Sequence, residues 1–109
     1  MNWNYLTSSE ELHKALKASN SDAIVLFKHS TRCPTSSMAL RLTESTWCLP
    51  ANIQAYFLDL IAHRDISGEI EHVLGVKHES PQMILVRNRK AVHHASHHQI
   101  DPTHLLSYL

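Results

Sequence analysis

The sequence lacks an excess of charge, a long apolar run and a low-complexity tract, and it has only two cysteines among 109 residues. Ten basic residues balance ten acidic ones, so bulk charge indicates neither a nucleic-acid partner nor a trap for acidic substrates. No apolar run approaches the ~20 residues that span a bilayer, and we expect no membrane partner. The first ten residues, MNWNYLTSSE, have neither the basic nor the apolar segment of a secretory signal.

Two cysteines without a leader point to the cytoplasm, where thiols stay reduced and serve reactivity or packing instead of structural disulfides. No segment has the composition of a linker. A chain of 109 residues suits one domain over residues 1–109 that is large enough to bury a core.

Helical and strand patterns alternate along the chain. The capping signature Ser8-x-x-Glu11 predicts a first helix that ends near Ser19 and Asn20. Apolar patterns predict strands over 23–27, 53–60, 82–86 and 91–98, and an edge strand over 3–6. Further helices are predicted over 34–47, from a cap at Asp65 or Ser67 to Gly75, and from Asp101-Pro102 onward with Leu105, Leu106 and Leu109 inward.

This order is a parallel βαβ half followed by a hairpin and a closing helix, which is the thioredoxin topology. We therefore predict an α/β, thioredoxin-like fold with a central mixed sheet of four to five strands flanked by helices. The hairpin is expected to have a turn longer than two residues. A two-residue turn needs positive φ at both Asn88 and Arg89, which an arginine tolerates poorly.

The stretch FKHSTRCPTS, residues 27–36, leads from the most apolar segment directly to a cysteine and a proline. Pro34 suits the first turn of a helix, where a missing N–H costs nothing. Cys33 is then at the helix start, where unpaired N–H groups and the positive end of the macrodipole favour a thiolate. Arg32 adds positive charge, as does Lys28 if its side chain points that way. We interpret Cys33 as a nucleophile toward disulfides and not as a buried, inert cysteine, because its neighbours are polar.

A dithiol motif would have its second cysteine at residue 36, which is a serine. Ser36 can hydrogen-bond a Cys33 thiolate but cannot form a disulfide, so an external thiol must release any mixed disulfide. Cys48 lies at the far end of the same predicted helix, ~22 Å away at 1.5 Å per residue. A disulfide needs Cα atoms within about 7 Å. Cys48 is therefore expected to be a packed residue of the helix end.

Ten histidines are an unusual number, and four of them fall in HHASHH, residues 93–98. In a strand over 91–98, His93 and His97 share one face while His94 and His98 share the other. The two imidazoles on each face then lie ~13 Å apart, too far to bind one ion together. No cysteine or carboxylate spacing completes a site. We expect solvated histidines and no metal site, with His97 or His94 near the reactive cysteine.

Three ordered segments resemble a known family. FKHSTRCPTS, GVKHESPQ of residues 75–82 and HASH of residues 94–97 resemble the bacillithiol-system redox-active proteins of the YtxJ type, the thioredoxin-like monothiol bacilliredoxins. The resemblance extends over nearly the whole chain and implies monothiol exchange at Cys33. The implied supporting residues are Arg32, Pro34, Thr35 and Ser36, and the implied substrate-binding residues are Thr31, Ser80 and Pro81. Pro81 would be a cis-proline facing the cysteine, and Ser80 would offer its backbone to the bound thiol.

The substrate that the resemblance implies is a client protein S-thiolated by bacillithiol, a sugar-linked cysteine that carries a malate. Cys33 would take up the bacillithiol and free the client thiol, and a second bacillithiol would regenerate Cys33. The low-molecular-weight thiol is thus a co-substrate, and no cofactor is tightly bound. Its carboxylates give Arg32 a role as an anion contact, although a small polar residue is expected there in many relatives, which leaves substrate preference open. The alternative is a non-catalytic binding or redox-sensing module in which Cys33 is only a reversible thiolation site.

Overall fold

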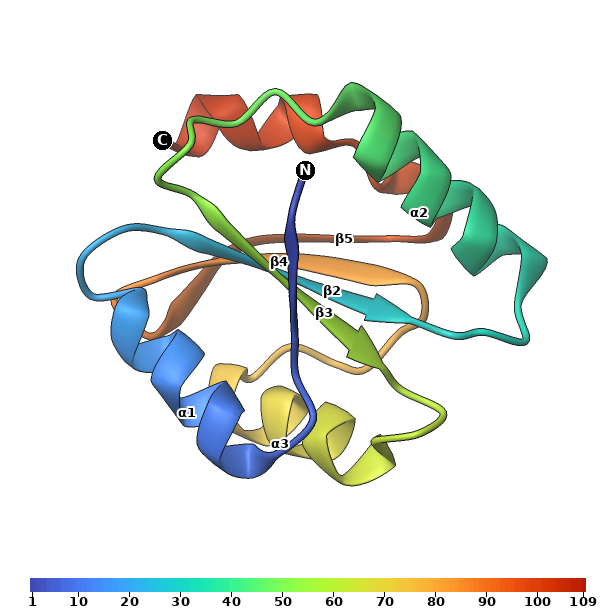
Figure 1. The fold of residues 1–109 in the computed structure, drawn as a ribbon, viewed down its shortest axis with the longest axis horizontal. Helices are drawn as coiled ribbons and strands as arrows, with labels where there is room; N and C mark the ends of the chain where they lie inside the picture. The colour runs from blue at the N-terminus through green and yellow to red at the C-terminus, as the bar shows by residue number, and fades with distance from the viewer.

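The strands form one mixed five-stranded sheet in the spatial order β1-β3-β2-β4-β5 (Figure 1). The computed structural model describes residues 1–109. Its strands are β1 (Trp3–Tyr5), β2 (Ile24–His29), β3 (Gln54–Asp59), β4 (Gln82–Arg87) and β5 (Lys90–Ser96). β1 and β2 each pair with β3 in parallel, whereas the pairs β2–β4 and β4–β5 are antiparallel. The predicted mixed sheet and its N-terminal edge strand are confirmed.

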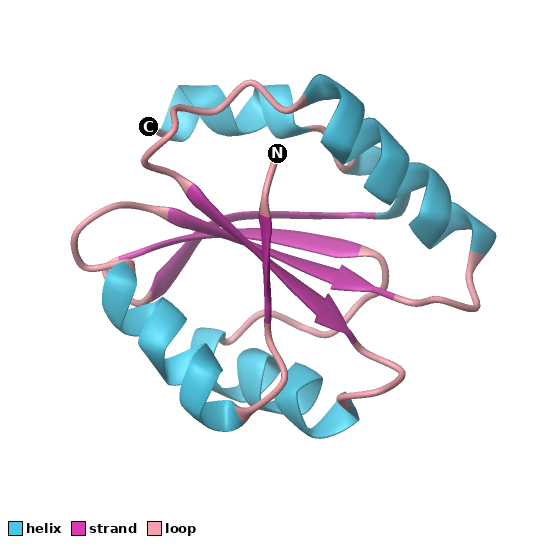
Figure 2. Ribbon diagram, in the orientation of Figure 1, coloured by secondary structure: helices cyan, strands magenta, loops and turns pink.

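Helices cover both faces of this sheet (Figure 2). On one face lie α1 (Ser9–Ala18) and α3 (Arg64–Leu74), and on the other lie α2 (Pro34–Thr46) and the 3-10 helix η2 (Pro102–Tyr108). The short 3-10 helix η1 (His97–Gln99) joins β5 to η2. No helix has both the length and the apolar character that crossing a membrane requires.

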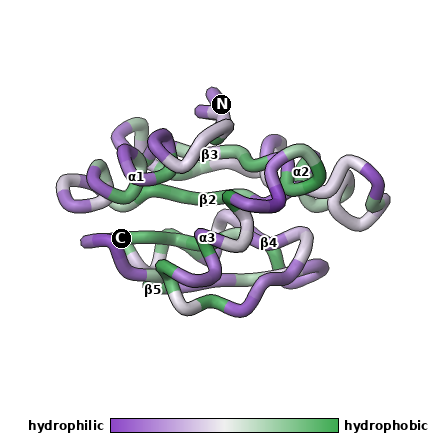
Figure 3. Tube along the Cα trace, turned by 90° about the horizontal axis from the view of Figure 1, so that it is seen from below, coloured by the Kyte–Doolittle hydropathy of each residue, from purple (hydrophilic) through white to green (hydrophobic).

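A hydrophobic cluster fills each space between the sheet and its helices. Alternate residues of β2 divide between the clusters, because successive side chains of a strand point to opposite faces. Ile24 and Leu26 belong to a cluster of 13 buried residues on the side of α1 and α3. Val25 and Phe27 belong to a cluster of 11 buried residues on the side of α2. Figure 3 accordingly shows β2 in hydrophobic colours over most of its length. The strand reads as apolar on both faces because helices cover both.

The first helix begins at the predicted capping signature. Ser8 is its N-cap, and the Glu11 N–H donates to the Ser8 Oγ over 3.2 Å. The Glu11 carboxylate in return accepts the N–H of Thr7 over 3.1 Å. Both contacts satisfy donors near the helix start that have no partner within the helix.

The third helix ends as predicted but begins differently. Gly75 has a φ of 67° and its N–H donates to the Glu71 carbonyl over 2.9 Å, which is a left-handed C-terminal cap. The helix begins at Arg64, before Asp65 and Ser67, and no side chain caps it. The predicted cap at either residue is therefore wrong, and the Ser67 hydroxyl is engaged elsewhere.

The turn between β4 and β5 contains only Asn88 and Arg89, because Arg87 pairs directly with Lys90. Their φ values are 52° and 63°, as a two-residue turn with positive φ at both positions requires. The predicted longer turn is wrong. Ser19 holds the tight turn: its carbonyl accepts the Asn88 N–H over 2.8 Å, and its Oγ accepts the Arg89 N–H over 2.9 Å.

We expect Arg89→Gly to raise the free energy of unfolding by about 0.5–1 kcal/mol, because glycine adopts positive φ without the steric penalty of a Cβ. The contact of the backbone N–H with Ser19 is retained. Chemical denaturation measures the effect. Arg87→Gly, at an extended strand position, is the matched control and should destabilise. A loss of stability in Arg89→Gly would contradict the assignment of strain to this residue.

Two strand ends differ from the sequence-based boundaries. β2 continues through Lys28 and His29, two residues past the predicted strand, and both residues are buried. β5 ends at Ser96, so the strand predicted over 91–98 is too long by two residues. His97 and His98 belong to η1 instead, and strand alternation therefore does not govern where their side chains point.

The C-terminal helix begins at Asp101-Pro102 as predicted, with the Asp101 carboxylate accepting the Thr103 N–H over 2.9 Å. Its predicted inner face is wrong in part. Leu105 is fully buried, whereas Leu106 and Leu109 are 45% and 41% exposed. The helix is a 3-10 helix with three residues per turn, so its buried positions, Pro102 and Leu105, recur every three residues.

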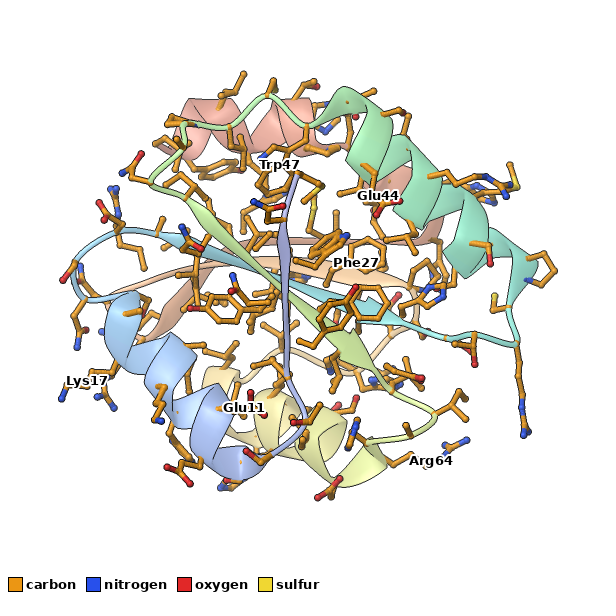
Figure 4. The ribbon with its side chains drawn as sticks, viewed as in Figure 1. Glu11, Lys17, Phe27, Glu44, Trp47 and Arg64 are labelled. Carbon is orange, nitrogen blue, oxygen red and sulfur yellow. The ribbon has the colours of Figure 1, made fainter.

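An aromatic cluster lies between the sheet and the C-terminal end of α2. The ring centroid of Trp3 is 5.7 Å from that of Phe27, 5.6 Å from that of Phe57 and 6.4 Å from that of Trp47. The Trp3 Nε1–H also donates to the Glu44 carboxylate over 2.9 Å. Figure 4 shows Phe27 on the α2 side of the sheet and Trp47 near the N-terminus of the chain. The cluster fixes one end of α2 and leaves its start, at Cys33, outside the aromatic packing.

Candidate functional site

Cys33 is the N-cap of α2, as the sequence predicts. Its backbone is extended, with φ −113° and ψ 117°, and Pro34 takes the first helical position. The Cys33 N–H donates to the Ser30 carbonyl over 3.2 Å, and the Cys33 carbonyl accepts the Ser37 N–H over 3.1 Å. The first contact closes the loop between β2 and α2 into a short arch, and the second is the first helical hydrogen bond of α2. Backbone hydrogen bonds on both sides therefore fix the position of Cys33 at the start of α2.

The side chain of Cys33 is half-buried and forms no disulfide. None of the side-chain hydrogen bonds in the structure involves its sulfur. The first turn of an α helix leaves its N–H groups without intrahelical acceptors and carries the positive end of the macrodipole. A thiolate at the N-cap is stabilised by both effects. The position thus combines access for a substrate with stabilisation of the reactive form.

Ser36 is fully buried and is engaged away from the sulfur. Its Oγ accepts the Ser30 N–H over 3.0 Å and lies 2.7 Å from the His29 Nδ1. The Ser36 hydroxyl, which could bond a Cys33 thiolate, makes its hydrogen bonds to the arch in this structure. The serine instead links the start of α2 to the β2–α2 arch and to the end of β2.

His29 is the residue of this arrangement that the sequence did not single out. Burial lowers the pKa of His29, although the carboxylates of Asp59 and Glu44 act in the opposite direction. The imidazole is therefore neutral at neutral pH. Its Nδ1 then accepts a hydrogen bond from the Ser36 hydroxyl, and the ring proton is on Nε2. The ring packs 5.4 Å from Phe57, between centroids, which joins the arch to the aromatic cluster.

The other residues before and after Cys33 differ in exposure. Thr31, Arg32 and Pro34 are exposed, and Thr35 is half-buried. Arg32 forms no ion pair within the chain, so its guanidinium is available to an anion. Lys28 does not add its charge here, because its side chain points elsewhere, to the opposite face of the sheet. Its Nζ donates to the Ser67 carbonyl over 3.2 Å there.

The Ser80–Pro81 segment approaches the same end of the sheet. The peptide bond between the two residues is cis, and Pro81 is buried. Gln82 pairs with Lys28 in the antiparallel β2–β4 register, so Pro81 lies beside the end of β2 from which the arch leaves. The Ser80 Oγ is buried without a hydrogen-bond partner. The structure thus brings Ser80 and Pro81 to the edge that carries Cys33.

A shallow pocket of about 240 Å³ lies between the first turns of α2 and η1. Thr35 and Met38 line it from α2, and His97 and His98 line it from η1. Met38 is 58% exposed, so part of the pocket wall is open to solvent. The His97 N–H donates to the Pro81 carbonyl over 3.1 Å, which ties the pocket to the cis-proline.

The histidines of the C-terminal third do not gather into a metal centre. No group of three or more histidine, cysteine, aspartate or glutamate side chains has the arrangement that holds an ion. His93 stacks on Tyr108 with ring centroids 4.7 Å apart, and burial lowers its pKa, with His94 and His104 adding to the effect. His97 lies near the candidate site, as one of the two predicted alternatives.

Cys48 is exposed just beyond the C-terminal end of α2. The prediction that it packs at the helix end is wrong. The helix that separates it from Cys33 has 13 residues, or about 20 Å. No second thiol of this chain therefore reaches Cys33.

Comparisons with known proteins agree with this arrangement. The family model described as the monothiol bacilliredoxin BrxC matches residues 4–105. A solved protein with a thioredoxin fold has a TM-score of 0.80 at 26% identity, over 94% of this chain and 89% of that chain. The thioredoxin of Malassezia sympodialis has a TM-score of 0.74 at 16% identity, over 98% of this chain and 87% of that chain. The thioredoxin of Fasciola hepatica has a TM-score of 0.73 at 13% identity, over 96% of this chain and 94% of that chain.

The solved structures confirm the predicted fold class. The family model spans nearly the whole chain and describes a protein that works with one thiol, as expected for Cys33 without a partner sulfur. A thiol redox role follows from both. The chain thus belongs to the monothiol bacilliredoxin family, as its three ordered sequence segments predict.

Proposed function

We propose that this protein is a monothiol exchange catalyst that removes bacillithiol, or a similar low-molecular-weight thiol, from S-thiolated client proteins. One observation carries the proposal: a half-exposed Cys33 caps α2 while no other cysteine of the chain is within reach. A thiolate at a helix start attacks disulfides. Without a local partner it cannot form an intramolecular disulfide and must exchange with thiols from outside.

The reaction has two exchange steps. The Cys33 thiolate attacks the sulfur of the small thiol in the client mixed disulfide. The bond between client and small thiol breaks, and the client leaves as a thiolate that takes a proton from water. A second molecule of the small thiol then attacks the mixed disulfide on Cys33 as its thiolate. Cys33 leaves as a thiolate, reduced again, and the two small thiols leave oxidised as a disulfide.

The exposed and buried neighbours suggest how the small thiol is held. Arg32 is exposed beside Cys33 and has no carboxylate partner within the chain, so we assign it to the carboxylates of the malate. Thr31 lies on the same arch. Ser80 and Pro81 are assigned to the cysteine part of the bound thiol. The Ser80 backbone would form hydrogen bonds with that part just before β4 begins.

Incubation with a bacillithiolated client, followed by intact-mass analysis, tests the proposal. We expect a mass gain of one bacillithiol on the protein, confined to Cys33, and recovery of the free client. Cys48→Ser is the matched control and should behave as the unmodified chain, whereas Cys33→Ala should show no transfer. If Cys33 becomes modified but neither releases its adduct to added bacillithiol nor turns over, the protein is a binding or redox-sensing module instead.

A further inference from the structure

A glutamate and a histidine pair beside the cis-proline. The Nδ1 of His97 lies 3.5 Å from a carboxylate oxygen of Glu79. The two side chains are 50% and 43% exposed, so the imidazole is open to solvent on one side. Glu79 lies on the Nδ1 side of the ring, so the other ring nitrogen, Nε2, is left to face an incoming molecule. A carboxylate near Nδ1 favours the tautomer with its proton on Nδ1, which leaves the lone pair of a base on Nε2.

The backbone at His97 is in the left-handed region, with a φ of 54°. Glycine adopts this conformation readily, whereas an L residue such as histidine adopts it at a cost. The N–H of His97 is fixed to the Pro81 carbonyl, and η1 begins at this residue. Strained residues persist where the surrounding structure holds them and cluster at functional sites. The strain is a second observation, independent of the ion pair, that distinguishes His97 from the neighbouring histidines.

His97 lies beside the N-terminal half of α2. Its side chain lines the pocket of about 240 Å³ together with Thr35, two residues beyond Cys33 on α2. The other α2 residues of this pocket are uncharged. The titratable groups around the imidazole are Glu79 from the segment before β4 and His98 from η1. A small thiol that approaches Cys33 over this pocket passes the imidazole.

We propose that His97, positioned by Glu79, is the base that takes the proton of the external thiol which regenerates Cys33. This inference rests on the proposed function. Nε2 accepts the proton of the incoming R–SH, and the resulting thiolate attacks the mixed disulfide on Cys33. The bond between Cys33 and the bound thiol breaks, Cys33 leaves as a thiolate, and a small-molecule disulfide forms. The imidazolium then returns its proton to water.

The need for a base follows from the absence of a second cysteine. A resolving cysteine within a dithiol motif is held beside the mixed disulfide, and neighbouring groups of the same protein can take its proton. An external aliphatic thiol arrives mostly protonated at neutral pH, since free thiols titrate near 8.5. Only the thiolate attacks. A positioned imidazole that accepts this proton supplies the missing step.

The test isolates the regeneration step. The protein is loaded with one small thiol on Cys33, and its release by added cysteine is followed by mass or by thiol appearance at pH 7 and pH 10. His97→Asn, which tolerates the left-handed backbone, should slow release at pH 7 by about 100-fold, the lower end of the range for general base catalysis. At about pH 10 the added thiol is already a thiolate, and the variant should match the unmodified chain. Glu79→Gln should show a smaller loss with the same pH dependence.

His97→Gly provides a second variant, because glycine relieves the backbone strain. We expect it to be at least as stable as the unmodified chain yet to be slow at pH 7, with imidazole in the buffer restoring part of the rate. His94→Asn is the matched control and should be unaffected. An equal loss at both pH values, or regeneration of His97→Asn at the unmodified rate, would overturn the role of His97. Failure of Cys33 to accept any thiol would instead overturn the proposed function.

Discussion

Replacing Ser36 with cysteine is expected to let the protein release the small thiol from Cys33 without any external thiol. Residues three apart on a helix lie about 5–6 Å from each other, within the Cα separation that a disulfide needs. The Ser36 hydroxyl points to the arch, so the introduced thiol would first rotate about its Cα–Cβ bond. It would then attack the Cys33 sulfur of the mixed disulfide, and the small thiol would leave with a proton. The protein would end as an intramolecular disulfide that only a separate reductant returns to use.

Release of the small thiol from loaded Ser36→Cys, with no thiol added, measures the change. The unmodified chain should release none, and the variant should release it stoichiometrically. Thr35→Cys is the matched control, because residues two apart on a helix do not face each other. A variant that still needs external thiol would show that the side chain at residue 36 does not face the Cys33 sulfur.

The same substitution should also lower stability. Ser36 accepts the buried Ser30 N–H and bonds His29, and sulfur is a weak acceptor. Leaving a buried donor poorly satisfied costs about 1–3 kcal/mol. Denaturation under reducing conditions separates this loss from any gain through the new disulfide. The serine therefore has a structural role besides determining how the mixed disulfide is resolved.

Lys28→Met is expected to stabilise the protein by about 1–3 kcal/mol at neutral pH. Lys28 is completely buried in the central strand and has no carboxylate within ion-pair distance. Burial lowers its pKa to about 8, from 10.5, while Glu71 acts in the opposite direction. Below pH 8 the amine is charged in both the folded and the unfolded protein, so the folded state carries the full desolvation penalty, about 3 kcal/mol. The unbranched thioether of methionine fills a similar space without a charge.

The sign of the pH dependence follows from the same values. Between pH 8 and 10.5 the unfolded chain binds more protons at this residue than the folded one, so stability rises with pH through that window. Lys28→Met should remove this rise. The substitution leaves both partners of the Lys28 amine, the His78 Nδ1 and the Ser67 carbonyl, with another hydrogen bond. The His78 Nδ1 keeps the Ser67 hydroxyl at 3.1 Å, and the Ser67 carbonyl lies within α3, where a helical N–H binds it.

Lys77→Met is the matched control for this experiment. Lys77 is exposed, so its substitution should change stability by less than about 0.5 kcal/mol and leave the pH profile intact. Burial lowers the pKa of His78, and the Lys28 cation lowers it further. Removing the cation should therefore raise the pKa of His78, which NMR titration follows. A destabilised Lys28→Met would indicate that the buried amine is a required part of the fold.

Much of the fold could be predicted because its local signals agree with its packing. The capping residues before α1, the strand that is apolar on both faces, and Gly75 each reflect one local cause. The errors arose where a distant residue decides the conformation. Ser19 holds the tight turn at Asn88 and Arg89 from the end of α1, and no pattern near the turn announces it. Likewise, a lysine and a histidine at the end of β2 are buried only because α3 and α2 cover them.

The position of Cys33 could be predicted from the proline and the strand before it, but the surroundings could not. Whether Ser36 faces the sulfur or the arch depends on His29, whose burial is a property of the assembled sheet. The ion pair of Glu79 and His97 joins residues far apart in sequence. The segments GVKHESPQ and HASH contain both residues, so the signal was present, yet nothing in the pattern shows that β5 ends early and turns His97 toward Glu79.

Both tryptophans of the chain belong to the aromatic cluster at the C-terminal end of α2. The 13 residues of α2, about 20 Å of helix, separate this cluster from Cys33. Intrinsic fluorescence therefore reports the integrity of the β1 edge and of the far end of α2, and serves well as an unfolding signal. It does not report the redox state of the sulfur, so exchange at Cys33 has to be followed by mass or by thiol absorbance.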